Sequence, residues 1–193
     1  MKLYDISQEV FGCVVFPGDP KPEREVLNDM HNGALYNLTA FRMCAHNGTH
    51  VDSPRHFYKD GKTLSDMDLS QFVGECYVAE HAGDITPDDM SAILARAGGA
   101  KRILIKGKAT LTNDAADIVA QSDIVLFGNE SQTVGPENAP MAVHLKLLGK
   151  EIALLEGIRL AEVPECHYLL CAAPIHLGNG DGAPCRAILI DQN

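Results

Sequence analysis

The stretch His46-Asn-Gly-Thr-His50-Val-Asp52-Ser-Pro-Arg-His56 is the most informative part of this 193-residue chain. It holds three of the eight histidines and one aspartate, and these side chains can bind a divalent metal or move a proton near neutral pH. Gly48 permits a tight turn between the first two histidines, and Pro54 stiffens the turn before the third. If His50 and Asp52 lie on a strand, their i, i+2 spacing places both side chains on one face. The stretch predicts a metal centre with a titratable histidine beside it.

A single histidine is more often a surface residue, or a core residue with a hydrogen-bond partner, than a metal ligand. That interpretation weakens when four metal-competent side chains share one short stretch that glycine and proline interrupt. Imidazole and carboxylate ligands suit zinc or a similar first-row ion. The stretch contains no cysteine, which argues against a structural site closed by thiolates.

The whole chain has an ordinary globular composition, with 46% apolar and 22% charged residues. Its length is enough for one substantial core, so we expect a single domain over residues 1–193. The formal net charge is −10 and lysine and arginine form no cluster, which argues against nucleic acid or an anionic membrane surface as a partner. A solvated acidic exterior explains this charge.

The N-terminal residues Met-Lys-Leu-Tyr-Asp-Ile-Ser lack the apolar run of a signal peptide, and no stretch approaches the length that spans a membrane. The six cysteines contain no Cys-x-x-Cys pair and form no dense framework. We therefore expect reduced thiols in a cytoplasmic protein.

Strand and helix patterns alternate from residue 74 to residue 156, which predicts an α/β protein with a mixed sheet. The strand at 34–45 should lead into the metal-binding stretch, and residues 174–184 should form a loop. The other strands are expected at 1–10, 74–81, 102–106, 123–127, 151–155, 167–173 and 185–190. One helix should begin after Thr86 as N-cap and stop at Gly98-Gly99, and others should cover 113–121 and 138–148, the last closed by Gly149.

Two metal-competent residues stand apart from the central stretch. His144 lies in the middle of an expected helix with apolar neighbours, and Glu156 follows an apolar strand, at the end where α/β proteins tend to build sites. The residues alone leave two interpretations open for each side chain. His144 is either a helix-surface histidine or part of a site, and Glu156 is either a solvated charge or part of a site.

The central stretch resembles the HxGTHxDxPxH signature of the cyclase-like metal-dependent hydrolases, a family that includes bacterial kynurenine formamidase and isatin hydrolase. All fixed positions of the signature are filled in this chain. The resemblance implies that His46, His50 and Asp52 bind the metal and that His56 is the catalytic acid/base. It further implies a swivelling β/β/α-type fold, a small-molecule substrate, and assembly as homodimers or higher homo-oligomers.

Family members with two metals use a His and a Glu twelve positions apart, and His144 and Glu156 match that spacing. The resemblance then implies that Asp52 bridges two ions, whereas in members with one ion the His and Glu shape the substrate and water network. Zinc is the expected metal, with manganese as the alternative. Both stoichiometries, one or two ions per chain, stay open.

The segment Phe16-Pro-Gly-Asp resembles the family's WPGDP segment, with Phe16 where arylformamidase-like members often carry Trp; this chain has no Trp. His176 lies in the loop before a glycine-rich segment similar to the family's, at a position where relatives often have Lys or an apolar residue, and it either lines the pocket or is a plain loop histidine. Phe16 and His176 are the candidate substrate-binding residues. The expected function is hydrolysis of an amide-type substrate, N-formylkynurenine first, by a metal-activated water with His56 as general acid/base. Two alternatives are opening of a cyclic imide, lactam or lactone, and a non-catalytic module that binds a metal or a ligand.

Overall fold

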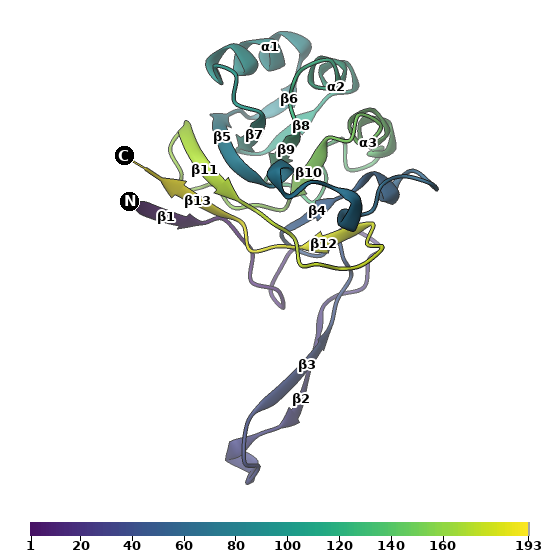
Figure 1. The fold of residues 1–193 in the computed structure, drawn as a ribbon, viewed down its shortest axis with the longest axis vertical. Coiled ribbons are helices and arrows are strands. Elements are labelled where there is room, and N and C mark those ends of the chain that lie inside the picture. Colours follow the sequence, from purple (N-terminus) through teal and green to yellow (C-terminus); the bar gives the residue numbers. More distant parts are fainter. Residues whose placement is uncertain (193) are drawn as a thin grey trace.

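The strands of one large sheet run through the whole chain, of which the computed structural model describes residues 1–192 (Figure 1). They are β1 (Lys2–Asp5), β4 (His50–Asp52), β5 (Val73–Glu80), β7 (Arg102–Lys106), β9 (Leu126–Asn129), β10 (Ala153–Glu156), β11 (Cys166–Cys171), β12 (Gly182–Pro184) and β13 (Ile188–Asp191). Within the described residues, the nine strands have the order β1-β13-β11-β5-β7-β9-β10-β4-β12. Neighbours from β5 to β10 pair in parallel, and the flanking strands pair antiparallel. The predicted α/β class with a mixed sheet is confirmed.

The three α-helices of residues 1–192 cover one face of this sheet: α1 (Pro87–Arg96), α2 (Asn113–Ala120) and α3 (Met141–Leu148) (Figure 1). A small parallel sheet of β6 (Gly83–Ile85) and β8 (Ala109–Leu111) lies on the same side. The connections of the described part of the chain contain four short 3-10 helices: η1 (Met30–Asn32), η2 (Pro54–His56), η3 (Leu64–Asp66) and η4 (Leu69–Gln71).

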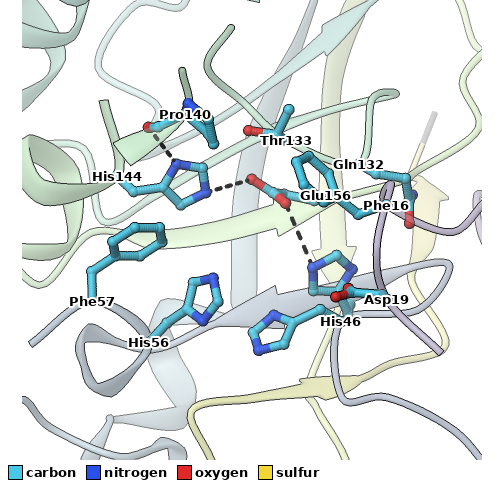
Figure 2. Close-up of a pocket in the computed structure, with 11 residues that line it drawn as sticks. Phe16, Asp19, His46, His56, Phe57, Gln132, Thr133, Pro140, His144 and Glu156 are labelled. Carbon is cyan, nitrogen blue, oxygen red and sulfur yellow. Dashed lines mark hydrogen bonds and ion pairs between the residues drawn. The ribbon is translucent and has the colours of Figure 1, made fainter. Parts of the chain in front are cut away.

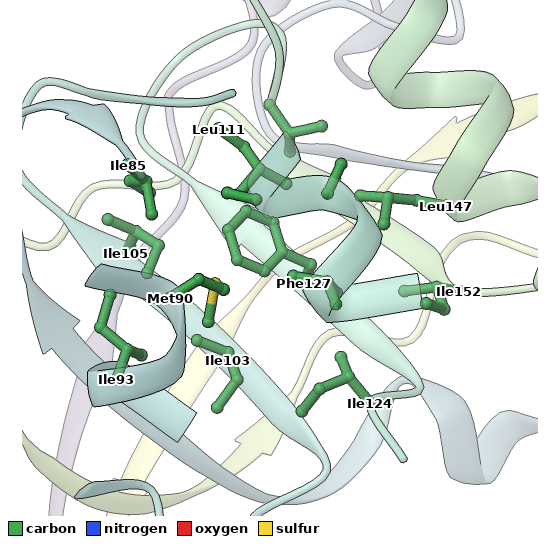
Figure 3. Close-up of a cluster of buried hydrophobic side chains, with 14 of the residues drawn as sticks. Ile85, Met90, Ile93, Ile103, Ile105, Leu111, Ile124, Phe127, Leu147 and Ile152 are labelled. Carbon is green, nitrogen blue, oxygen red and sulfur yellow. The ribbon is translucent and has the colours of Figure 1, made fainter. Parts of the chain in front are cut away.

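The central strands β7, β9 and β10 are mostly apolar, with polar or charged residues only at their ends, because both of their faces are buried. On β7, Ile103 and Ile105 point to the helices, where they pack in the cluster that Figure 3 shows, with Met90 of α1 and Phe127 of β9. The intervening Leu104 belongs to a second cluster on the opposite face, inside the curl of the sheet. The period of two along each strand thus divides one apolar run between two cores.

The helix signals agree with the structure at most ends. Thr86 caps α1 and forms a capping box with Asp89, as the residue pattern predicts, and α1 ends just before the two glycines. Helix α3 begins at Met141 rather than at residue 138. The reason is Pro140, because a residue that precedes proline is disfavoured in the α-helical region.

Residues 34–45 contain a strand, as predicted, but it is shorter than predicted and does not join the main sheet. Strand β3 covers only Leu38–Arg42 and pairs with β2 (Glu23–Asn28), which the sequence pattern did not indicate. These two strands form an arm that extends away from the rest of the protein (Figure 1). Most side chains of the arm are exposed on both faces, so the alternation in its sequence does not report a buried face. Strand β4 carries the metal-binding stretch instead.

Other boundaries differ by a few residues. The strand expected at 123–127 is β9, shifted to Leu126–Asn129, and of residues 1–10 only Lys2–Asp5 are extended in the sheet. The loop expected at 174–184 contains the short strand β12, which pairs with β4 at the edge of the sheet. Among residues 1–192, no helix combines the length and the apolar character that crossing a membrane requires.

Candidate metal centre

Strand β4 places its two metal-competent residues between β10 and β12. His50 and Asp52 lie on this strand, as the spacing required, and are 1% and 0% exposed. Across the antiparallel pair with β10, His50 lies directly opposite Glu156. Residues opposite each other share a face of the sheet. The alternation on β4 and the register with β10 therefore bring three ligand-type side chains to one place.

The carboxylate of Asp52 lies at the centre of the cluster (Figure 2 shows the surrounding residues). Its Oδ1 is 2.8 Å from His46 Nδ1 and 3.4 Å from His50 Nε2, and its Oδ2 is 3.6 Å from His144 Nε2. Glu156 connects the same histidines, with Oε2 3.5 Å from His50 Nε2 and Oε1 3.2 Å from His144 Nε2. All five sequence-predicted metal residues are brought together.

The turn before β4 positions His46. Gly48 has a φ of 66°, a left-handed conformation that glycine adopts without strain, and a Cβ there would lie 2.9 Å from Cys13 Cβ. Gly182 on β12 provides the space for the imidazole, because a Cβ on it would lie 2.5 Å from His46 Cε1. The site therefore requires glycine at both positions, because a side chain at either would be too close to its neighbours.

Backbone carbonyls orient the other two histidines. His144 Nδ1 donates to the Pro140 carbonyl at 2.9 Å, and His50 Nδ1 donates to the Gly48 carbonyl at 3.1 Å. Each bond holds the ring by Nδ1 and turns Nε2 toward the carboxylates, where it carries a proton in the metal-free cluster and would face a bound metal. Metal-bound histidines are usually held in this way by the second nitrogen.

The cluster holds protons when no metal is bound. Burial disfavours the charged imidazole, but the neighbouring carboxylates outweigh burial and raise the pKa of His46 to about 11 and the pKa of His50 and His144 to about 9. Burial likewise opposes ionisation of Asp52, yet His46 and His50 hold the pKa of its carboxyl well below the usual value. A divalent cation in this position replaces those protons.

The donor set fits a metal. It consists of imidazole nitrogens and carboxylate oxygens, which suit zinc and similar first-row ions. Asp52 Oδ2 is buried and has no hydrogen-bond partner among the described residues. Such an oxygen is costly unless a cation or a donor satisfies it. His50, Asp52 and Glu156 place ligand atoms within 4.8 Å of one another, as do His46, Asp52 and His56.

His56 lies at the edge of the cluster, at the end of η2. Its ring stacks on His46 with 4.1 Å between ring centroids, and its side chain is 29% exposed, far more than the other four groups around Asp52. Burial, together with the charges of His46 and His144, lowers the pKa of His56 below the ordinary value, although Asp52 and Glu156 oppose this. His56 is therefore a neutral base beside a cationic cluster.

A cavity of about 260 Å³ lies against the cluster. Phe16, Phe57 and Pro140 provide apolar walls, and the polar residues Gln132 and Thr133 close another side (Figure 2). The candidate substrate residue Phe16 is thus brought to the metal cluster.

His176 is not brought to this cavity. It is exposed and lines a different hollow, together with Met67, Phe72 and Ile175. Its loop runs along the surface before β12, and only the residues close to β12 approach the cluster. His176 therefore lies outside the cavity at the metal cluster.

Asp181 is a site residue that the sequence pattern did not single out. Its Oδ2 lies 3.2 Å from His46 Nε2 and 3.9 Å from His56 Nδ1, and His46 lowers the pKa of the Asp181 carboxyl to about 2. The feature of the sequence that could have revealed it is an acidic residue between two glycines in the C-terminal loop. Its separation from His46 by 135 positions concealed the contact.

A family model described as a putative cyclase matches residues 4–135, more than half of the chain. The chain belongs to the cyclase family. Kynurenine formamidase from Erythrobacter litoralis is 33% identical to this cyclase-family chain over 202 residues, which cover 97% of the chain and 93% of the relative. Kynurenine formamidase from Salinibacter ruber is 30% identical over 99% of the chain and 98% of the relative.

Solved structures show the same fold. A potential metal-dependent hydrolase with cyclase activity superposes with a TM-score of 0.84 at 26% identity, over 100% of this cyclase-family chain and 98% of the other. Isatin hydrolase A from Labrenzia aggregata gives a TM-score of 0.85 at 20% identity, over 97% and 93% of the two chains. The family resemblance and the cyclase fold are confirmed, and the protein is a metal-dependent hydrolase of this family.

Proposed function

We propose that this enzyme hydrolyses the formamide of an N-formyl aryl amine, with N-formylkynurenine as the first candidate. The observation that carries the proposal is the position of His56, a neutral histidine at the edge of a buried cluster of metal ligands. The cavity beside it has aromatic walls from Phe16 and Phe57, which suit an aryl ring. The 30–33% identity to kynurenine formamidases over nearly the whole chain supports the same reaction.

Five residues would hold the metal. His46, His50 and Asp52 surround one position, and Asp52, His144 and Glu156 surround a second, so the cluster has donors for one or two ions. Zinc is our first candidate and manganese the second, because the donors are imidazoles and carboxylates. When bound, the metal polarises the carbonyl group and lowers the pKa of water toward about 7.

His56 moves the protons. Its neutral imidazole accepts a proton from the water that attacks the formyl carbon, and the protonated ring then donates this proton to the amine nitrogen as the C–N bond breaks. The products are formate and the free aryl amine. Phe16 and Phe57 hold the ring and exclude bulk water, while Asp181 orients His46 beside the reacting groups.

The second candidate reaction is hydrolytic opening of a cyclic imide, lactam or lactone. The observation that favours it is Phe16, which lines the cavity where arylformamidase-like relatives often carry Trp. A smaller aromatic wall leaves room for a fused ring. The same residues would serve this reaction, because water attacks a carbonyl carbon in both.

The test is turnover by the metal-loaded protein on a panel of N-formylkynurenine, isatin, simple imides and lactones. We expect N-formylkynurenine to be hydrolysed, and His56→Ala to lower turnover by roughly 10²–10⁴-fold with the metal content unchanged. Full activity of His56→Ala would contradict the assignment of the base. Turnover of ring substrates alone would move the proposal to the second reaction.

We further propose that the enzyme acts as a homodimer or larger homo-oligomer in the cytoplasm. The arm of β2 and β3 supports the oligomeric assembly, because an isolated two-stranded hairpin is marginally stable in water. The arm and the turn at its tip expose apolar side chains that a second copy would cover: Val26, Leu27, Met30, Leu35, Tyr36 and Phe41. Sedimentation equilibrium of the full chain and of Phe41→Ser tests this proposal, and a monomeric wild type would contradict it.

A further inference from the structure

A second cavity, of about 250 Å³, adjoins the one at the metal cluster. Phe16, Gln132 and Thr133 line both cavities and so form the wall between them. The metal-side cavity is lined by no lysine or arginine, whereas the second is lined by Lys108 and by the oppositely charged Glu137. The two spaces therefore differ in chemistry although they share a wall.

The two charged groups have no partners of their own. Within residues 1–192, neither Lys108 nor Glu137 forms an ion pair or a side-chain hydrogen bond. Both side chains are exposed, so their charges are free to meet a ligand that enters the cavity. Unpaired charges of opposite sign that line one cavity suit a ligand that itself carries both charges.

The shared wall contains polar atoms that lack partners. Thr133 is 5% exposed, yet its Oγ1 has no hydrogen-bond partner, and the buried Oε1 of Gln132 also has none among the described residues. Gln132 is held in place by its Nε2, which donates to the Gly48 carbonyl at 3.0 Å. Buried polar groups usually have a partner, so this hydroxyl and this amide oxygen are available to a ligand.

The backbone at Lys108 is held in one position. Gly107 has a φ of 109°, its N–H donates to Glu130 Oε2 at 2.6 Å, and a Cβ on it would lie 2.4 Å from the His81 carbonyl oxygen. The Lys108 carbonyl accepts from the Gly83 N–H at 2.8 Å. These contacts fix the path of the chain between β7 and β8 beside the cavity.

From these observations we infer that the second cavity binds the zwitterionic α-amino-acid arm of the substrate, with Lys108 on the carboxylate and Glu137 on the ammonium group. The inference rests on the proposed formamidase reaction, for which the aryl formamide occupies the cavity at the metal cluster. The arm extends past Phe16, where the Thr133 hydroxyl donates to the carboxylate and the Gln132 amide oxygen accepts from the ammonium group. Substrates of this enzyme are then aryl formamides that carry an amino acid.

The first experiment compares two substrates, N-formylkynurenine and N-(2-acetylphenyl)formamide, which keeps the aryl ketone and the formamide but lacks the amino acid. We expect Lys108→Met to raise KM for N-formylkynurenine by about tenfold and to leave the kinetics of the truncated substrate unchanged, because a charge-assisted hydrogen bond is lost. Lys101→Met is the matched control, since Lys101 lies at the other end of β7. Equal effects of Lys108→Met on both substrates would overturn the inference.

The second experiment needs no turnover. Calorimetry measures the binding of kynurenine and of 2-aminoacetophenone to the metal-loaded wild type, Lys108→Met and Glu137→Gln. We expect both substitutions to weaken kynurenine binding, by about tenfold for Lys108→Met, and to leave 2-aminoacetophenone unaffected. Lys108-dependent kynurenine binding without any hydrolysis would uphold the subsite and refute the proposed reaction. Hydrolysis of both formamides, together with kynurenine binding that does not depend on Lys108, would uphold the proposed reaction and refute the subsite.

Discussion

His50 and Glu156 lie directly opposite each other on the antiparallel strands β4 and β10, with 3.5 Å between His50 Nε2 and Glu156 Oε2. The pair is almost fully buried, so the sheet register itself holds two of the metal residues in place. Since β10 also pairs in parallel with β9, the cluster rests on the most buried part of the sheet. A loop-borne site would lack this rigidity.

Asp52→Asn should remove the metal from the protein. Its two oxygens approach three histidines, and a neutral amide offsets no cation charge. We expect metal content, measured by mass spectrometry of the purified protein, to fall to background, and turnover to fall by more than about 100-fold. Asp60→Asn, in an exposed turn, is the control and should retain both. Retention of one ion per chain by Asp52→Asn would contradict its central position.

Asp181→Asn should weaken metal binding without unfolding the protein. The Asp181 carboxylate contacts His46 Nε2, and loss of such a supporting contact lowers metal affinity by roughly 10–100-fold. Competition with a chromogenic chelator measures this affinity. Asp123→Asn changes the same charge on an exposed surface and should have no effect. An unchanged chelator curve for Asp181→Asn would show that His46 needs no such support.

Gly182→Ala should displace the His46 ring, because the added Cβ would lie 2.5 Å from His46 Cε1. We expect metal affinity to fall while the circular dichroism spectrum stays unchanged. Gly178→Ala in the same loop meets nothing within 4 Å and serves as the matched control. If Gly182→Ala binds metal as tightly as wild type, the imidazole has more room than the structure provides.

The metal-free protein should be most stable in mildly acidic solution. The pKa of His50 and His144 is raised to about 9 in the folded state, so their contribution is complete below the ordinary pKa of 6.5 and is lost as the pH rises toward about 9. The lowered pKa of Asp52 and Glu156 makes their contribution disappear as the pH falls below about 4. We therefore expect the highest melting temperature between about pH 4.5 and 6.5.

Above about pH 6.5, the zinc-loaded protein should instead become more stable as the pH rises. Protons compete with the metal for the same nitrogens, so metal affinity, and with it the added stability, rises as the pH rises. Thermal unfolding with chelator and with zinc, from about pH 5 to pH 9, provides both curves. A chelator-treated protein that gains stability between pH 6.5 and 9 would contradict the protonated state of the cluster.

Local rules predicted much of the fold and most of the site. The i, i+2 spacing of His50 and Asp52 placed both on one face of a strand, and Thr86 and Gly149 marked helix ends where the structure has them. Residue pattern alone left His144 and Glu156 open, because their proximity depends on sheet register and helix packing. The family spacing was needed to pair them.

What escaped prediction depends on contacts between distant parts of the chain. Strand β3 alternates like a core strand, but its partner β2 and its position outside the main body are not encoded in its own pattern. Asp181 reaches His46 only because β12 pairs with β4. His176, four residues before Gly180, lies in the same loop but on another surface.

On helix α3, His144 and Leu147 lie three residues apart on the same buried face: His144 reaches the carboxylates, and Leu147 packs in the core under the helices. Rotation of α3 by even a few degrees would therefore change the distance from His144 Nε2 to the carboxylates. The helical layer and the metal thus constrain each other mechanically. A substitution that repacks Leu147 would therefore shift His144 relative to the carboxylates, although Leu147 itself is remote from any substrate. Changes in this core and changes in the reaction are for that reason coupled in evolution.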